Sequence, residues 1–348
     1  MNKKRILSLA GVVVTLAFIY LGMAVYGLLW APNTKVQEPI ATIFIATDAS
    51  FEEVMEQLFP LLDDPLSFDR LSRIKRYGQN IRPGRYQITE GLNNIELINL
   101  LRSGNRPMML TFNNQERIED LAGALAKQIE QDSLSLYKAF TDPEFFQQMD
   151  GVDRDNVLAL FIANSYEVYW NTSPEALCQR MIKEYRAFWN ETRMAKATAL
   201  GLSALEVISL AAIVQKESVK VSERPRIAGV YMNRLAKGIM LQADPTVIYA
   251  KKYVENDFSQ VIRRVLYKDL TLDSPYNTYK YKGLPPGPIA MPDISSIEAV
   301  LSPEKHQFYY FVADPERPGY HQFSTNLKQH NQKRQAYVLW LAKNKIKR

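Results

Sequence analysis

The most apolar stretch of the chain lies at its N-terminus. After Lys3, Lys4 and Arg5, the chain runs through Ile6–Trp30 without a charge. A helix of that length measures roughly 37 Å, enough to cross the roughly 30 Å hydrocarbon core of a bilayer. A cleaved signal peptide has a shorter apolar region, and a buried core helix seldom stays uncharged for so long. We therefore expect residues 1–32 to form a cytoplasmic tip and a transmembrane anchor, because basic residues favour the cytoplasmic side.

Apolar runs and capped helices alternate after a short polar linker, which we expect at Asn33–Pro39. Three segments predict strands: Ala41–Ala46, Arg85–Ile88, which follows the turn pair Pro83-Gly84, and Met108–Phe112. Two pairs have the spacing of a capping box and predict that a helix follows: Ser50 with Glu53, and Asn93 with Glu96. Residues 41–112 should therefore form a small α/β unit.

The remaining residues, 113–348, predict a larger mixed domain. Helical patterns dominate up to about Arg193, apart from the aromatic segment Phe161–Trp170, which suits a loop or a strand. Near the end, two strands are predicted at Phe308–Val312 and His321–Ser324, joined by the turn Pro315–Gly319, and a basic helix follows them. The predicted fold class is α+β, with an N-terminal transmembrane helix, a small α/β unit and a mixed α+β domain.

Two helices in the middle of this domain have clear start signals. Ser203 and Glu206 form a third capping box, so a helix should begin at Ala204. A second helix is expected near Ser222, with Ser222 as its N-cap and Pro225 in its first turn.

Composition limits the function classes. The net charge of +6, spread over 43 basic and 37 acidic residues, is weaker than the concentrated basic face of a nucleic-acid binder. Cys178 is the single cysteine, which rules out an intramolecular disulfide. The three histidines have no metal-ligand spacing with cysteine, and neither a nucleophile elbow nor a phosphate-binding loop occurs. We expect no metal, no cofactor and no nucleic-acid partner.

The residue with the clearest chemical potential is Glu217. On the helix that the third capping box starts, it shares a stripe with Leu210 and Val214, because helical neighbours lie three, four and seven positions apart. Burial on that stripe is expected to raise its pKa from about 4.3 toward about 6, where a carboxylic acid donates a proton near neutral pH. Cleavage of a glycosidic bond needs such an acid. The alternative is a frayed helix end, at which Glu217 pairs with Lys220 or Arg224.

A second carboxylate, Glu223, follows closely. By default a glutamate at a helix start complements the helix dipole and stays in solvent, which is what we expect for Glu223. Amide, hydroxyl and aromatic residues suited to sugar binding occur in three later segments, although such residues are also common in structured loops. The segments are Leu241–Tyr249, Ser274–Tyr279 and Gly283–Ile289.

These segments together resemble the MltG family, the YceG-like endolytic murein transglycosylases. The matching strings, in order, are Ile213–Ser218, Ser222–Arg224, Val230–Leu235, Leu241–Tyr249, Tyr276–Tyr279, Gly283–Ile289 and Thr325–Leu327. The resemblance is dense from about Ala204 to His330 and looser over residues 41–112, where the family has a LysM-like subdomain. The chain departs from the family at Gln215, where an acidic residue is usual, and at Ala163–Tyr166, where Pro-Asp-Thr-Tyr is usual.

The resemblance implies an endolytic peptidoglycan lytic transglycosylase, with Glu217 at the position of the catalytic glutamate. Glu217 would protonate the oxygen between N-acetylmuramic acid and N-acetylglucosamine, and then act as base on the muramyl C6 hydroxyl to close a 1,6-anhydro ring. No second carboxylate is then needed to activate water, in contrast to most glycosidases. The implied setting is the inner cell membrane, where the enzyme would end glycan elongation.

Seven further residues are expected to line the groove around Glu217: Gln242, Asp244, Tyr276, Asn277, Thr278, Tyr279 and Asn326. The expected partners are peptidoglycan glycan strands, the membrane through the N-terminal helix, and peptidoglycan polymerases such as penicillin-binding proteins. Two alternatives stay open. One is a catalytically silent, membrane-anchored peptidoglycan-binding scaffold, and the other is a membrane-tethered hydrolase that releases a reducing sugar end.

Overall fold

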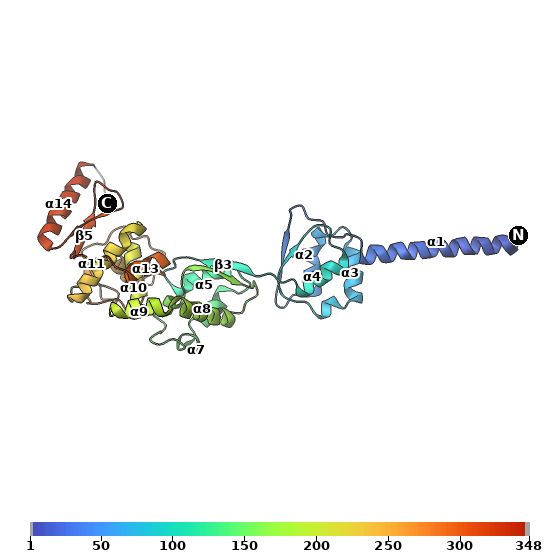
Figure 1. Ribbon diagram of the computed structural model, residues 1–348, viewed down its shortest axis with the longest axis horizontal. Coiled ribbons are helices and arrows are strands. Elements are labelled where there is room, and N and C mark those ends of the chain that lie inside the picture. The colour runs from blue at the N-terminus through green and yellow to red at the C-terminus, as the bar shows by residue number, and fades with distance from the viewer. Residues whose placement is uncertain (1–2, 345–348) are drawn as a thin grey trace. The chain divides into compact units, whose positions relative to one another are not determined.

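The computed structural model describes residues 3–344, with side chains from Ala10 onward. Two residues of the predicted segment 1–32 and the last four of the predicted domain 113–348 therefore lie outside the described residues. Helix α1, Lys3–Leu29, is the predicted apolar helix, and Figure 1 shows it as a straight rod. Its part from Ala10 to Leu29 is long and apolar enough to cross a membrane and is not buried. These properties are consistent with a membrane anchor or a signal sequence.

The chain divides into two compact units. The first contains the residues up to Leu110, with two short returns at Gln128–Gln131 and Tyr166–Thr172. The second contains Thr111–Lys127, Asp132–Ser165 and the residues from Ser173 onward. The overall fold class is mixed α+β, as the sequence predicts.

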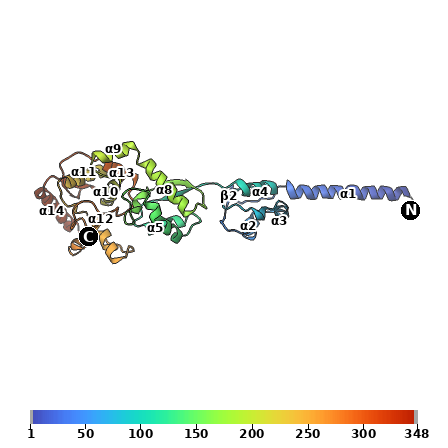
Figure 2. The ribbon, with the colours of Figure 1, turned by 90° about the horizontal axis from the view of Figure 1, so that it is seen from below.

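The first unit contains two paired strands and three helices besides α1. In chain order these are β1 Ala41–Ile45, α2 Phe51–Leu58, α3 Pro65–Ile74, β2 Gly84–Ile88 and α4 Asn94–Ser103, with short 3-10 turns at Phe59–Leu61 and Tyr77–Gln79. Strands β1 and β2 are antiparallel, with Ala41 opposite Ile88. Figure 2 shows α4 on one side of the unit and α2 and α3 on the other.

Both predicted capping boxes form, and they start α2 and α4 as expected. Helix α3 is absent from the sequence prediction, although its start has a local signal. Asp64 is its N-cap and accepts a hydrogen bond from the backbone of Ser67, and Pro65 follows in the first turn. The helix also needs its apolar residues Phe68 and Leu71 to be buried, which they are.

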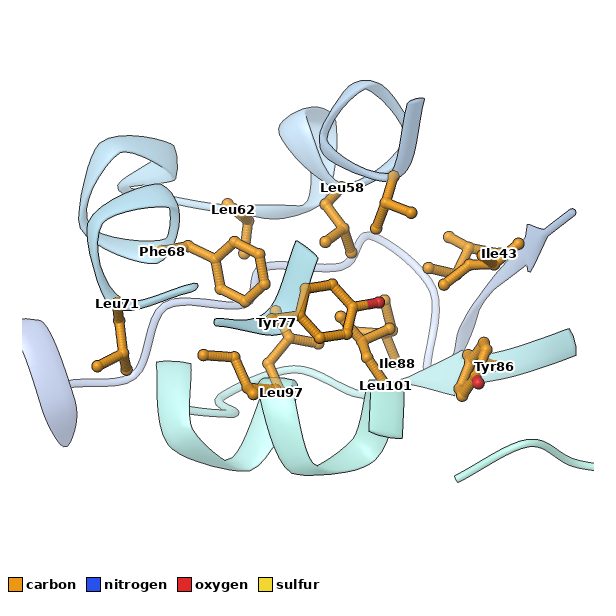
Figure 3. Close-up of a cluster of buried hydrophobic side chains, with 13 residues drawn as sticks. Ile43, Leu58, Leu62, Phe68, Leu71, Tyr77, Tyr86, Ile88, Leu97 and Leu101 are labelled. Atoms are coloured by element: carbon orange, nitrogen blue, oxygen red, sulfur yellow. The ribbon is translucent and has the colours of Figure 1, made fainter. Parts of the chain in front are cut away.

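The core of the first unit lies between these helices and the β1–β2 pair. Its members include two tyrosines, Tyr77 and Tyr86, whose side chains are fully buried. Figure 3 shows Phe68 and Tyr77 pointing into the space above α4. The apolar side chains of β1 and β2 point to the same face because alternate residues of a strand do so.

The segment after α1 is part of the first unit, and the prediction of a polar linker at Asn33–Pro39 is wrong. Asn33 and Thr34 are both 3% exposed. Their backbone N–H groups both donate to the carbonyl of Leu92, and the next residue, Lys35, donates from its backbone to the carbonyl of Leu61. Polar residues suggested a linker, but here they satisfy buried hydrogen-bonding groups.

The second unit is built mainly from helices. Those before the candidate site are α5 Ile118–Ala126, α6 Ser133–Phe140, α7 Pro143–Phe146, α8 Pro174–Phe188 and α9 Glu191–Ala199. Those around it are α10 Ala204–Glu217, α11 Arg224–Ala236, α12 Asp244–Glu255, α13 Ile294–Leu301 and α14 Leu327–Lys343. Three 3-10 turns connect them: Val157–Leu160, Val221–Glu223 and Asp269–Thr271.

Two further two-stranded sheets complete the fold. Strand β3, Met108–Phe112, pairs with β4, Asn164–Val168, and the boundary between the two units falls within these strands. The aromatic segment around residue 165 is therefore a strand. Near the C-terminus, β5, Tyr310–Ala313, pairs in antiparallel fashion with β6, His321–Ser324, close to the predicted positions.

Helix α10 is the central helix of the second unit and begins at Ala204, as predicted, with its capping box formed. Every residue from Val207 to Val214 is buried, so the helix is enclosed on all sides rather than along one stripe. It packs against α11, α12 and α13.

Helix α11 begins one residue later than predicted. Its N-cap is Glu223, which makes no side-chain cap, because the 3-10 turn Val221–Glu223 extends the loop that precedes the helix. Ser222 lies exposed within that turn, so the prediction that Ser222 is the N-cap is wrong. Pro225 is in the first turn, as predicted.

Candidate active site

Glu217 is the last residue of α10, and its carboxyl group meets the neighbouring helix α11. The buried Tyr231 hydroxyl donates a hydrogen bond of 2.8 Å to Glu217 Oε1. Of the residues that the structure describes, Tyr231 is the one partner that hydrogen-bonds to this carboxyl group. Arg224 instead binds Asp293, so the alternative of a frayed, ion-paired helix end is not what the structure has.

Burial raises the pKa of Glu217 to about 7. The nearby charge of Asp244 adds to this effect, while the hydrogen bond from Tyr231 and the charge of Arg234 act in the opposite direction. The side chain is partly accessible, because it opens on a cleft, but protein atoms surround it elsewhere. The balance leaves a carboxyl group that is half protonated near neutral pH.

The cleft beside Glu217 has a volume of about 370 Å³. Three of the seven predicted groove residues line it, namely Gln242, Asp244 and Tyr279. The other lining residues are Tyr231, Arg234, Leu241, Tyr310, Phe311, Leu327, His330, Asn331 and Arg334. The cleft is therefore rich in aromatic and hydrogen-bonding groups, the types that bind sugars.

Asp244, the first residue of α12, is the second carboxylate of the cleft. The Tyr279 hydroxyl donates a hydrogen bond of 2.6 Å to Asp244 Oδ1. Burial and this carboxylate both raise the pKa of Tyr279 above its usual range, which keeps it protonated as a donor.

Gln242 adopts a left-handed backbone conformation, with φ of 49°. Such a conformation is strained for a residue other than glycine and is often found at functional sites. Thr278 fixes the backbone of Gln242 and Ala243. Its carbonyl accepts a hydrogen bond from Gln242 N at 3.1 Å, and its hydroxyl accepts one from Ala243 N at 3.0 Å. Thr278 itself is buried, so it shapes the cleft without lining it.

The other three predicted groove residues lie elsewhere. Tyr276 lines a separate cavity of about 420 Å³ together with Tyr249. Asn277 is fully buried, and its amide donates to the carbonyls of Leu270 and Leu272. Asn326 is exposed and caps α14.

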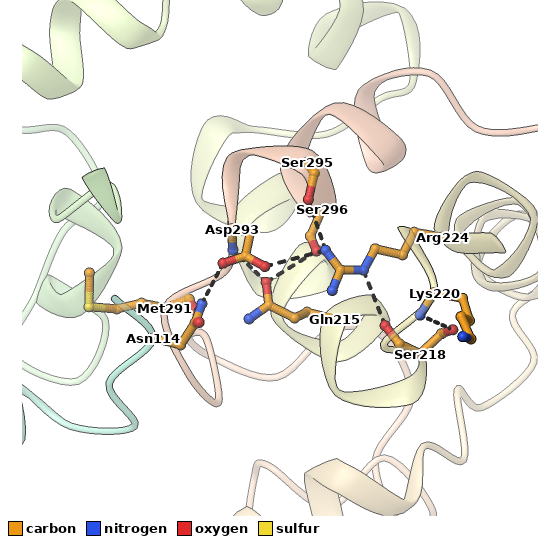
Figure 4. Close-up of polar contacts among 9 residues, drawn as sticks. All are labelled: Asn114, Gln215, Ser218, Lys220, Arg224, Met291, Asp293, Ser295 and Ser296. Atoms are coloured by element: carbon orange, nitrogen blue, oxygen red, sulfur yellow. Dashed lines mark hydrogen bonds and ion pairs between the residues drawn. The ribbon is translucent and has the colours of Figure 1, made fainter. Parts of the chain in front are cut away.

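The loop before α13 fixes the end of α10 next to Glu217 (Figure 4). Gln215 accepts hydrogen bonds from the backbone of Asp293 and from the hydroxyl of Ser296. Arg224 donates to the carbonyl of Ser218 at 3.1 Å and pairs with Asp293 at 3.4 Å. The residues on both sides of Glu217 are thus held in place, and Gln215 serves as a neutral acceptor.

Glu223 is buried, and the expectation that it lies in solvent is wrong. It is 5% exposed, and both of its carboxylate oxygens bind His321, one through the backbone at 2.8 Å and one through the ring at 2.7 Å. This interaction joins the start of α11 to β6. No local sequence pattern predicts this interaction, because the two residues lie 98 positions apart.

Sequence reasoning missed several residues of the cleft. No individual role was assigned to Tyr231, Arg234, Tyr310 or Phe311, all of which line the cleft. Composition alone favoured no site role for His330, although it lies in the cleft with its ring stacked on Tyr310 at 5.2 Å. The spacing along α14 could have indicated a shared face, but not that this face meets Glu217.

Across residues 3–344, no group of three or more metal-ligating side chains is found. The arrangement offers proton transfer by Glu217 in a cleft with hydrogen-bonding and aromatic walls.

Comparisons with known proteins agree with one another. The model of the YceG-like family matches residues 43–336. An endolytic murein transglycosylase of Bacillus subtilis (strain 168) is 32% identical over 272 residues, which cover 73% of this chain and 72% of that protein. An endolytic murein transglycosylase of Streptococcus pneumoniae (serotype 2) is 31% identical over 154 residues, 43% of this chain and 27% of that protein. The crystal structure of a yceG-like protein of Listeria monocytogenes has a TM-score of 0.56 and 27% identity, and the match covers 84% of this chain and 98% of that one.

Proposed function

The chain belongs to the YceG-like family, and on that premise we propose that it is an endolytic lytic transglycosylase of peptidoglycan. Its substrate is the glycan strand, and the bond cleaved is the one between N-acetylmuramic acid and N-acetylglucosamine. The observation that carries the proposal is the Glu217 carboxyl group, whose pKa of about 7 suits an acid that must donate and then accept a proton.

In the first step Glu217 is protonated and gives its proton to the bridging oxygen as the bond from that oxygen to the muramyl C1 breaks. In the second step the Glu217 carboxylate takes the proton of the muramyl C6 hydroxyl. The C6 oxygen then bonds to C1, and the product is a 1,6-anhydro ring. No water is consumed, and Glu217 ends in its starting state.

Tyr231 and Asp244 tune this acid in opposite directions. The hydrogen bond from Tyr231 stabilises the carboxylate, and the negative charge of Asp244 destabilises it. Gln242 and Tyr279 line the same cleft and are the proposed sugar-binding groups. We further propose supporting roles for Thr278, through its hydrogen bonds to the Gln242 segment, and for Asn277.

A hydrolase is the second candidate, and the presence of Asp244 in the cleft is the observation that favours it. Most glycosidases use two carboxyl groups, one as the acid and the other as a nucleophile or as the base that activates water. Asp244→Asn separates the two functions. A transglycosylase keeps forming anhydro ends in this variant, while a hydrolase that needs Asp244 as base stops forming reducing ends.

The proposed location is the cell membrane, with the N-terminus in the cytoplasm and the catalytic unit outside. The apolar helix α1 supports it. The anchor would hold the enzyme beside nascent strands and beside peptidoglycan polymerases, where cleavage would end elongation. We also propose that residues 41–112 are a LysM-like subdomain, supported by a hydrophobic core of their own.

Topology is testable with a thiol at Lys35, which is exposed. The native Cys178 does not interfere, because it is buried and its thiol pKa is raised to about 12. We expect Lys35→Cys to react with a membrane-impermeant thiol reagent from outside. Labelling from the cytoplasmic side alone would contradict the orientation.

The direct test of the function is product analysis. The full-length protein in detergent is incubated with purified glycan strands, and the new ends are identified by mass spectrometry. A truncation at Lys35 is avoided, because Asn33 and Thr34 are buried in the first unit. Anhydro-muramyl ends are expected. Reducing ends would establish the hydrolase, and binding without new ends would establish the scaffold.

A further inference from the structure

One wall of the Glu217 cleft comes from the C-terminal helix α14. Its lining residues are Leu327, His330, Asn331 and Arg334. They are three, four and seven positions apart and therefore lie on one face of the helix. A helix face that packs into a core is normally apolar, but three of these four side chains are polar. This face is suited to a polar occupant of the cleft.

The cleft holds two arginines, Arg234 and Arg334, that form no ion pair within the described part of the chain. Arg334 is exposed and forms no ion pair with any residue between positions 10 and 344. Arg234 is buried, and its guanidinium donates to the main-chain carbonyls of Tyr309, Met240 and Leu241. Carbonyl groups satisfy the hydrogen bonds of Arg234 but do not neutralise its charge.

The acidic groups of the cleft do not pair with these arginines. Glu217 binds Tyr231, and Asp244 accepts from Tyr279. His330 carries no negative charge that could pair with the arginines. Burial lowers its pKa, and the charges of Arg334 and Arg234 lower it further. Its Nδ1 atom is buried and has no hydrogen-bond partner in the described part of the chain.

We propose that Arg334 binds a carboxylate carried by the muramyl residue of the glycan. This proposal rests on the proposed function, because it takes the glycan as the occupant of the cleft. The N-acetylglucosamine ring is neutral, whereas the lactyl group of the muramyl residue ends in a carboxylate or carries a peptide with carboxylates. A guanidinium binds a carboxylate through two parallel hydrogen bonds, which gives direction as well as attraction.

Recognition of this carboxylate selects the register of the strand. The two sugars alternate, so a strand shifted by one residue would present the wrong glycosidic bond to Glu217. Arg334 would hold the muramyl residue on one side of the scissile bond. It is thus a specificity-determining residue.

The test measures binding to the full-length Glu217→Gln protein in detergent, which makes it independent of turnover. Three short glycans serve as ligands: one with its peptides, one without peptides and with a free lactyl carboxylate, and one without peptides whose carboxylate is converted to a methylamide. We expect Arg334→Gln to weaken binding of a carboxylate-bearing glycan about tenfold, the size of a charge-assisted contact. Binding of the methylamide should change less than about twofold.

The ligand that responds identifies the source of the carboxylate. A loss confined to the peptide-bearing glycan assigns it to the peptide, and a loss confined to the peptide-free glycan assigns it to the lactyl group. Arg334→Lys keeps the charge and should retain part of the affinity. Lys328→Gln is the matched control, because it removes a charge from an exposed position of α14 outside the cleft lining and should change nothing.

Equal losses for all three ligands, or no loss for either carboxylate-bearing glycan, would overturn the proposal. Its failure is distinguishable from failure of the proposed function. If the wild-type protein makes no anhydro ends while Arg334→Gln still discriminates by charge, the function is wrong and the carboxylate site is right. If the wild-type protein makes anhydro ends but Arg334→Gln does not discriminate by charge, the function is right and the carboxylate site is wrong.

Discussion

Each of the two compact units buries a cluster of polar side chains beside a helix end. In the first unit, Asn33, Ser67 and Asn94 join the end of α1 to α3 and α4. Asn94 accepts from Asn33 at 2.7 Å and donates to Ser67 and to the carbonyl of Leu28, each at 3.0 Å. Asn33 also accepts from the backbone of Asp64 at 2.6 Å.

The cluster around Glu217 differs in two respects. Its central group can ionise, and one of its two oxygens has a hydrogen-bond partner among the described residues. The amide cluster, in contrast, is neutral and well satisfied. A neutral, satisfied cluster stabilises a fold, whereas a carboxylate with too few partners is costly to keep. The first cluster is therefore suited to stability, and we propose that the second serves chemistry.

The largest expected effect is on the rate of Glu217→Gln. The variant keeps the shape of the side chain but cannot transfer a proton, so we expect at least about a 100-fold loss of glycan cleavage. Product formation over time, followed by mass spectrometry, measures it.

The matched control is Glu206→Gln, the same substitution on the same helix. Glutamine also completes a capping box, so both fold and rate should persist. Turnover by Glu217→Gln at the wild-type rate would remove Glu217 from the mechanism.

For Asn94→Ala in the first unit we expect a loss of stability without a loss of cleavage rate. The substitution leaves the amide of Asn33, the hydroxyl of Ser67 and the carbonyl of Leu28 with fewer partners, so we expect a loss of roughly 2–4 kcal/mol in the free energy of unfolding of that unit. Cleavage per folded molecule should be unchanged. Denaturant unfolding monitored together with activity checks both; a fully stable variant would show that the cluster contributes little.

The pH dependence of stability separates the two clusters further. The pKa of Glu217 is raised from 4.5 to about 7 in the folded state, so its stabilising contribution is complete below pH 4.5 and is lost as the pH rises through 7. Glu217→Gln should therefore gain stability relative to the wild type on going from pH 4 to pH 8, by up to about 3 kcal/mol. Thermal unfolding of both proteins across this range measures it, and a constant difference would contradict the raised pKa.

A smaller effect is expected for Tyr231→Phe. The hydroxyl lowers the pKa of Glu217, so its removal should move the pH–rate profile to higher pH, by up to about one unit. The rate at the optimum should fall a few-fold, because the carboxyl group is held less firmly. A profile shifted to lower pH would mean that Tyr231 does not stabilise the carboxylate.

Local patterns in the sequence predicted the helix starts well. The capping boxes at Ser50, Asn93 and Ser203 all form, because such a box involves hydrogen bonds between residues three positions apart. The segments Ala41–Ala46 and Arg85–Ile88 were correctly predicted as strands, β1 and β2. The polar segment at Asn33 was misread, because polar composition does not reveal whether a buried partner such as Asn94 is available.

The candidate site could be predicted only in part. The apolar surroundings and position of Glu217 indicated a raised pKa, and the pKa of about 7 is somewhat higher than expected. Its partners come from distant segments, such as Asp244 from α12 and Arg334 from α14. The burial of Glu223 against His321 could not be predicted either, since a contact between residues far apart in the sequence produces no periodic pattern.

The central claim is that Glu217 holds its proton near neutral pH, and its pKa can be measured directly. Protein labelled with ¹³C at the glutamate carboxyl carbons is titrated by NMR, and the Glu217 signal is assigned by its absence in Glu217→Gln. A midpoint near pH 7 is the predicted result. A midpoint below about pH 5, close to that of an ordinary glutamate, would contradict the account.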